Sequence, residues 1–165
     1  MNRFKISFFV TVLFISAVLV SDATLWDQKA QKLQNGIRTL NTLLSINPFP
    51  DDVPGLNIAI TNKTEQMMSD LTALDITLQN ELASLSAGDK QEALSTYAAL
   101  LMLVADVGEM LALRSFGQLT LTLVNTYNVS YNTYFSIAGQ YNLTTQKLPI
   151  GVTFDDGGGW IPGTR

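Results

Sequence analysis

Apolar residues recur at helical spacing in several stretches of the chain. In the first stretch, alternating steps of four and three residues place them on one side of an amphipathic helix. These positions are Trp26, Ala30, Leu33, Ile37, Leu40 and Leu44. The run NPFPDDVPG follows, and its three prolines lack the backbone donors that a helix needs, so they predict an extended connector.

Two further stretches predict helices of similar length. The second helix is expected to begin near Asn62, with Glu65 in the capping-box position, and to end at Gly88. The third is expected to begin at Asp89, whose carboxylate can cap a helix N-terminus. The inward positions are Ile60, Thr64, Met67, Leu71, Leu74, Leu78, Leu82 and Leu85 in the second helix, and Leu94, Tyr97, Leu101, Val104, Gly108 and Leu111 in the third. Matched lengths and short connectors predict antiparallel neighbours in a bundle.

The third helix contains the most apolar stretch after the N-terminus, ALSTYAALLMLVADVGEMLAL, from Ala93 to Leu113. On insertion scales each Leu or Val contributes about −0.3 to −0.6 kcal/mol, whereas one Asp costs about 2.5 to 3.5 kcal/mol. The two acids, Asp106 and Glu109, therefore outweigh the apolar residues, and a buried core helix is favoured over a membrane span. Their spacing of three places both acids on one helical face, where a solvent-facing strip is favoured over a catalytic carboxylate pair.

Residues 115–146 contain no charged side chain. Alternation of apolar residues with Thr and Asn is compatible with strands, which gives an alternative fold of three helices plus a β-hairpin at about 118–134. Helical spacing also fits, with Gln118, Thr122, Asn125, Asn132, Ser136 and Gln140 on the outer side. We favour a helix, because a fourth helix fills the groove that three helices leave open.

The predicted fold is therefore all-α, a four-helix up-down bundle over residues 24–146 with an extended Gly/Pro-rich C-terminal tail over residues 147–165. The consecutive glycines at 157–159 are expected to release the end of the chain. Helix is excluded in this tail by its prolines and glycines.

The N-terminal residues 1–23 have the pattern of a secretory signal peptide. Arg3 and Lys5 precede an apolar run, and small residues stand before an expected cleavage after Ala23. The protein is therefore expected to be secreted and extracellular, with no membrane as a partner once the signal is removed. The chain has no cysteine, so packing without disulfides must hold it. Its formal net charge of −4 does not favour nucleic acid as a partner.

The composition also restricts the chemistry. The chain contains no His and no Cys, which excludes imidazole acid–base catalysis, thiol nucleophiles and the usual zinc sites. No enzymatic activity, cofactor or metal site is expected. Three sequons make Asn62, Asn128 and Asn142 candidate N-glycosylation sites.

The favoured function is an extracellular protein-interaction module. Tyr and Asn make adaptable contacts, and an uncharged surface is easily desolvated, so Tyr131, Tyr134 and Tyr141 are the candidate interaction surface for an unknown extracellular protein. One alternative is a carrier of apolar small molecules or lipids, with Met67, Met102 and Met110 lining the ligand site between the helices. A further alternative is a membrane-active effector.

Overall fold

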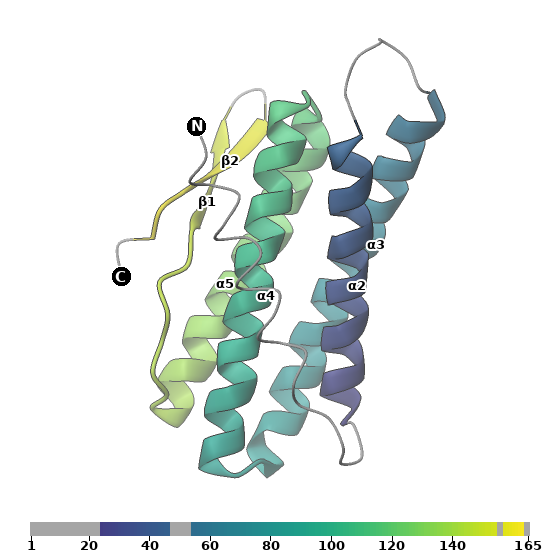
Figure 1. Cartoon of the computed structure of the whole chain (residues 1–165). Coiled ribbons are helices and arrows are strands. Elements are labelled where there is room, and N and C mark those ends of the chain that lie inside the picture. Colours follow the sequence, from purple (N-terminus) through teal and green to yellow (C-terminus); the bar gives the residue numbers. More distant parts are fainter. Residues whose placement is uncertain (1–23, 47–53, 155–156, 164–165) are drawn as a thin grey trace, which may run out of the picture.

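The computed structural model describes residues 24–46, 54–154 and 157–163; the predicted signal peptide, 1–23, and most of the proline-rich connector, 47–53, lie outside these residues. In this part of the chain, four helices run side by side (Figure 1). They are α2 (Leu25–Ser45), α3 (Pro54–Glu81), α4 (Ala87–Leu113) and α5 (Gly117–Tyr141), with a short 3-10 helix, η2 (Leu82–Ser84), after α3. The predicted four-helix bundle is confirmed. The alternative hairpin at about 118–134 is wrong, because these residues lie within α5.

The helix starts differ in part from the prediction. A capping box opens α2, where the Thr24 hydroxyl accepts from the Asp27 N–H at 3.1 Å. Helix α3 begins at Pro54, well before the predicted start at Asn62, since the first helical position tolerates a proline. Helix α4 begins at Ala87, because the Ser86 hydroxyl rather than the Asp89 carboxylate accepts from the capping N–H.

The core lies where the helical spacing placed it. All the predicted inward positions of α2 and α4 are buried, and those of α3 are buried from Ile60 to Leu82. The buried hydroxyl of Thr64 donates to the C=O group of Ile60 at 2.8 Å, so this hydroxyl has a hydrogen-bond partner within its own helix. The predicted outer side of α5 is exposed at Gln118, Asn125 and Asn132.

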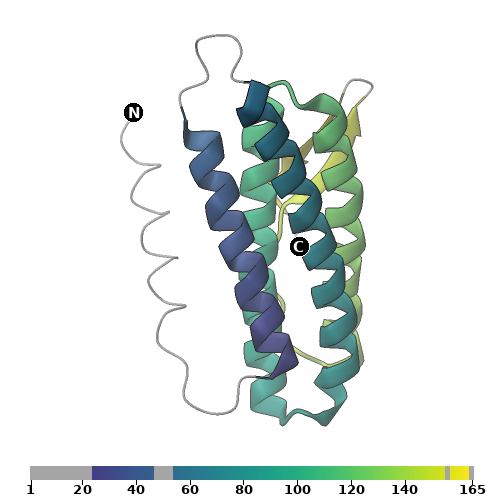
Figure 2. The ribbon, with the colours of Figure 1, turned by 90° about the vertical axis from the view of Figure 1, so that its right-hand side faces the viewer.

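The C-terminal tail ends in two antiparallel strands, β1 (Ile150–Phe154) and β2 (Gly157–Ile161), which lie against α4 and α5 on the side away from α2 and α3 (Figure 1). In the view turned by 90°, α2 and α3 lie in front and the two strands lie behind them (Figure 2). The consecutive glycines do not release the chain. A Cβ atom on Gly158 would lie 2.7 Å from a methyl group of Val124, so glycine allows β2 to lie close to α5.

Candidate functional site

One side of α5 holds the C-terminal strap, which we define as residues 142–154 and 157–163. The Tyr127 hydroxyl donates to the C=O group of Pro149 at 2.7 Å, and the Asn128 side-chain amide donates to the C=O group of Gly151 at 3.1 Å. Farther along the helix, the Tyr134 hydroxyl accepts from the Gln146 N–H at 2.6 Å. These polar side chains of α5 are therefore occupied by the chain itself.

Trp160 fixes the strap to the bundle. Its ring lies over Gly108 of α4, where an added Cβ atom would be 2.0 Å from the nearest ring atom. The ring also meets Tyr127 edge-on, with 5.8 Å between the ring centroids and 82° between the ring planes. Only 9 % of Trp160 is exposed, although no hydrogen-bond partner of its indole N–H is found among the described residues. Shape complementarity therefore holds this side chain.

The three tyrosines predicted as an interaction surface lie in different environments. Tyr134 is fully buried, so it belongs to the core and not to a contact surface. Tyr131 is half-buried in an aromatic cluster, with its ring centroid 4.8 Å from that of Phe135. Tyr141 is also half-buried and lines a groove at the end of α5. The aromatic residues of α5 thus mainly pack inward, because their spacing matches the helical period.

A groove of about 520 Å³ separates α3 from the outer side of α5. Its polar side chains are amides and hydroxyls, and none of its lining residues is charged. The lining residues are Gln79, Leu82, Val129, Asn132, Thr133, Ser136, Ile137, Gln140 and Tyr141. The helical spacing of α5 identified Asn132, Ser136 and Gln140 as outward-facing. Only the packing of α3 and η2 against α5 adds Gln79 and Leu82, which lie far away in the sequence.

The three methionines predicted to line an apolar ligand site do not come together. Met67 is buried in the core, Met102 is 41 % exposed and Met110 is half-buried. None of them lines the groove between α3 and α5. The geometry of the described residues therefore gives the carrier hypothesis no common site.

A polar cluster in the core, which the sequence pattern did not reveal, joins three helices. Asp75 of α3 accepts hydrogen bonds from the Tyr97 hydroxyl of α4 and, at 2.7 Å, from the Ser130 hydroxyl of α5. Asp75 is 6 % exposed, and Tyr97 and Ser130 are fully buried. Desolvation raises the pKa of Asp75 above its usual value of 3.8, against the opposing effect of the two hydrogen bonds. The helical period placed Tyr97 in the core, but it could not show which polar groups would meet it.

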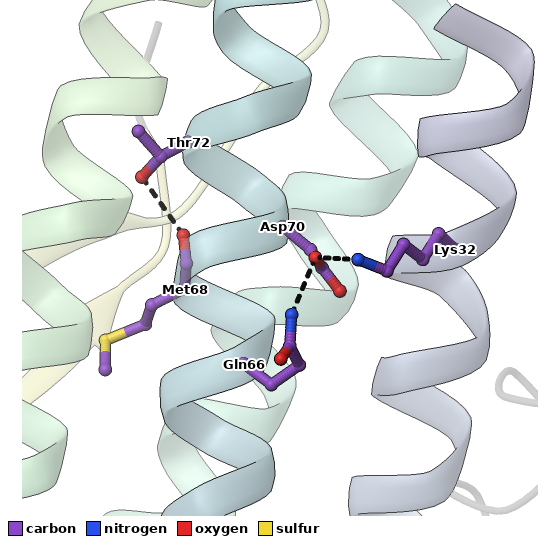
Figure 3. Close-up of polar contacts among 5 residues, drawn as sticks. All are labelled: Lys32, Gln66, Met68, Asp70 and Thr72. Carbon is purple, nitrogen blue, oxygen red and sulfur yellow. Dashed lines mark hydrogen bonds and ion pairs between the residues drawn. The ribbon is translucent and has the colours of Figure 1, made fainter. Parts of the chain in front are cut away.

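A second buried carboxylate lies at the contact between α2 and α3 (Figure 3). Asp70 accepts from the Lys32 ammonium group at 2.8 Å and from the Gln66 amide at 2.9 Å, so helix α2 supplies its cation. The Lys32 side chain is 64 % exposed, while that of Asp70 is 8 % exposed. On another side of α3, the Thr72 hydroxyl donates to the C=O group of Met68, within the same helix (Figure 3). These contacts join two helices and present no open ligand position.

Asp106 and Glu109 occupy the exposed strip of α4, as predicted from their spacing. Desolvation, followed by the negative charge of Glu109, raises the pKa of Asp106.

Among residues 24–46, 54–154 and 157–163, no cluster of three carboxylates is placed to hold a metal ion. Helix α4 has the length and composition to cross a bilayer, and half of its most apolar window is buried inside the bundle.

The three sequons lie in contrasting positions. Asn62 is exposed on α3, Asn128 is half-buried beneath the strap, and Asn142 is exposed at the end of α5.

The chain matches no family model, and no curated protein or solved structure is significantly similar to it. Inferences about function therefore depend on the chemistry of the groove and of the residues around it.

Proposed function

We propose that the protein is secreted and that it binds another extracellular protein, without catalysis, through the groove between α3 and α5. The observation that carries this proposal is the lining of the groove, which combines amides, hydroxyls and apolar side chains and has no charged residue. An uncharged surface loses less solvation free energy when a partner covers it than a charged surface does.

The lining also has the chemistry to bind a polypeptide. Asn132, Ser136 and Gln140 lie on successive turns of α5, and their exposed side chains can both donate and accept hydrogen bonds. Val129, which is 64 % exposed, and the half-buried Tyr141 add apolar area that a partner can bury. A protein segment with free backbone N–H and C=O groups would complement this lining, because every such segment needs both donors and acceptors.

Isosteric charges within the groove test this proposal. Asn132→Asp combined with Gln140→Glu keeps the side-chain shapes but makes a partner desolvate two carboxylates. We expect the affinity for an extracellular partner to fall about tenfold or more, as follows from a cost of about 1 to 3 kcal/mol per buried unpaired group. Binding of the tagged protein to cells that display extracellular proteins measures this effect.

The matched control introduces the same charges elsewhere on the same helix. Asn125→Asp combined with Gln118→Glu changes exposed α5 positions that do not line the groove. This control should bind the partner as the unaltered protein does. A partner whose affinity is equally insensitive to both pairs of substitutions would exclude the groove as the contact surface.

The proposed secretion has a separate test. Expression of the full chain in a eukaryotic secretory cell should deliver to the medium a protein whose N-terminal residue is Thr24, as cleavage after Ala23 requires. N-terminal sequencing of the collected protein measures this. A chain that stays in the cell with residues 1–23 attached would overturn this part of the proposal.

A further inference from the structure

We infer that Asn142 is an acceptor for an N-linked glycan and that the fold closes the sequon at Asn128 to the same modification. The inference rests on the proposed secretion, because the transfer takes place in the secretory pathway. It concerns two sequons that are close in sequence, Asn128-Val-Ser and Asn142-Leu-Thr, but lie in opposite environments, one beneath the strap and one at the strap's first residue.

The backbone at Asn142 presents its side chain to solvent. Asn142 follows the last residue of α5 and has left-handed dihedral angles, φ 52° and ψ 48°, which asparagine adopts more readily than most residues. Its backbone N–H donates to the C=O groups of Ala138 and Gly139, so helix-capping contacts use the main chain and leave the exposed side-chain amide in solvent. The acceptor nitrogen is therefore accessible in the folded protein.

The hydroxyl of the same sequon is accessible as well. Gln91 of α4 holds the backbone of Thr144, accepting from its N–H at 2.9 Å and donating to its C=O group at 3.0 Å. Leu143 between them packs against the core, while the side chains of Asn142 and Thr144 are both exposed. The segment is not helical, so the amide and the hydroxyl remain accessible after folding.

Both groups of the Asn128 sequon are engaged in the fold. The Asn128 amide nitrogen donates to the C=O group of Gly151, and a Cβ atom at Gly151 would lie 2.6 Å from the Asn128 amide oxygen. The hydroxyl of Ser130 is fully buried and donates to Asp75. A sugar on Asn128 would occupy the space of strand β1, so modification there and docking of the strap exclude each other.

The transfer needs a lipid-pyrophosphate-linked oligosaccharide as the donor. A bond forms between Nδ2 of Asn142 and C1 of the first sugar, while the bond between that C1 and the phosphate oxygen breaks. The amide nitrogen releases one proton to solvent, and the lipid pyrophosphate leaves with the electron pair of the broken bond. Because Gln140 and Tyr141 line the groove and directly precede Asn142, the attached glycan would border one end of the groove.

Expression in a eukaryotic secretory cell tests the inference, with Asn62→Gln present throughout to remove the third sequon. We expect the intact mass to show one glycan, which an N-glycosidase removes. This glycan should be lost in Asn142→Gln and retained in Asn128→Gln. A glycan that is lost in Asn128→Gln, or a protein in the medium with no glycan, would overturn the inference.

Thr144 supplies a second pair of variants that leaves the capping residue intact. Thr144→Ala should abolish the glycan and Thr144→Ser should keep it, since the contacts with Gln91 use only backbone atoms of residue 144. Circular dichroism of both proteins checks that the fold is unchanged. Loss of the glycan in both variants, or in neither, would contradict Asn142 as the acceptor.

A parallel preparation separates this inference from the proposed secretion. In it, an established signal sequence replaces residues 1–23, so that the chain enters the secretory pathway whatever its own N-terminus does. If only this preparation is secreted and carries the glycan at Asn142, the proposed secretion fails and the inference stands. If the unaltered chain is secreted but neither preparation carries a glycan, secretion stands and the inference fails.

Discussion

The contact between α2 and α3 differs in construction from the α4–α5 side of the bundle. Helix α2 buries one continuous row of apolar side chains, and an ion pair between Lys32 and Asp70 links it to α3. On the other side, α4 and α5 together carry the C-terminal strap, with Trp160 seated over Gly108. The α2–α3 contact thus joins two helices directly, whereas the other side also involves a segment outside the helices.

The two buried carboxylates of α3 show the same contrast. Asp70 and Asp75 are each 6 % exposed, but Asp70 faces an ammonium group and Asp75 faces two hydroxyls. A cation compensates a buried negative charge, whereas hydroxyl donors satisfy the oxygen atoms without neutralising the charge. Asp70 and Asp75 are therefore equally buried, but a negative charge is compensated by a cation only at Asp70.

The largest effect is expected from Trp160→Ala. Removal of this buried ring should lower the free energy of unfolding by about 3 to 5 kcal/mol, because it empties the space over Gly108. Urea unfolding followed by circular dichroism measures the change. The neighbouring exposed residue gives the control, since Ile161→Ala should cost less than about 1 kcal/mol. Equal effects of the two variants would show that Trp160 does not anchor the strap.

Gly108→Ala should have the next largest effect. The added methyl group would overlap the Trp160 ring, so we expect a loss of about 1 to 3 kcal/mol in unfolding free energy. Gly36→Ala is the matched control on α2, because a Cβ atom there meets nothing within 4 Å. That control should stabilise the protein by about 0.5 to 1 kcal/mol through helix propensity. Thermal unfolding of both variants measures these effects. If Gly108→Ala stabilised the protein, the close contact between Gly108 and the Trp160 ring would be contradicted.

Asp75→Asn should alter the pH dependence of stability. The raised pKa of Asp75 means that the folded state holds its proton more tightly than the unfolded state does. Its stabilising contribution is complete below the unfolded value near 3.8 and is lost as the pH rises through the folded pKa. Asp75→Asn has no carboxyl group here to lose its proton. The free energy of unfolding of this variant, minus that of the unaltered protein, should therefore increase as the pH rises through that window.

Urea midpoints at a series of pH values from acid to neutral measure this difference. Asp70→Asn is the control on the same helix, at a carboxylate paired with a cation. A difference between Asp75→Asn and the unaltered protein that is constant with pH, or that decreases as pH rises, would contradict the raised pKa.

The smallest effect is expected from Lys32→Gln. The Lys32 side chain is 64 % exposed, so solvent screens its ion pair with Asp70, and the loss should be less than about 1 kcal/mol. Gln66, whose amide donates to Asp70 at 2.9 Å in the unaltered protein, should still satisfy one oxygen of this carboxylate. Unfolding at low and high salt measures the effect, which should shrink at high salt. A loss above about 2 kcal/mol would mean that the α2–α3 contact depends on the ion pair more than on its apolar row.

The candidate site was predictable only in part. The helical period places Asn132, Ser136 and Gln140 on the outer side of α5, and all three line the groove. The same period gives no partner for them, and Gln79 and Leu82 complete the groove only because α3 packs beside α5. Tyr134 is expected on an interaction surface because tyrosine makes adaptable contacts and its segment carries no charge, but its ring belongs to the core and its hydroxyl contacts the strap.

The sequence by itself determined the first three helices and the side of each that is buried, because the helical period is a local property of the chain. The pattern of residues 118–134 fits strands as well as a helix, and the packing of α5 against the other helices decided in favour of the helix. Trp26, Leu33 and Leu101 are buried where their spacing placed them. The tertiary structure alone decided that Asp75 meets Tyr97 and Ser130, and that the glycines near the C-terminus fit against α5 instead of freeing the tail. These contacts join residues that are far apart in the chain, and a local pattern contains no information about the distance between such residues once the helices have packed.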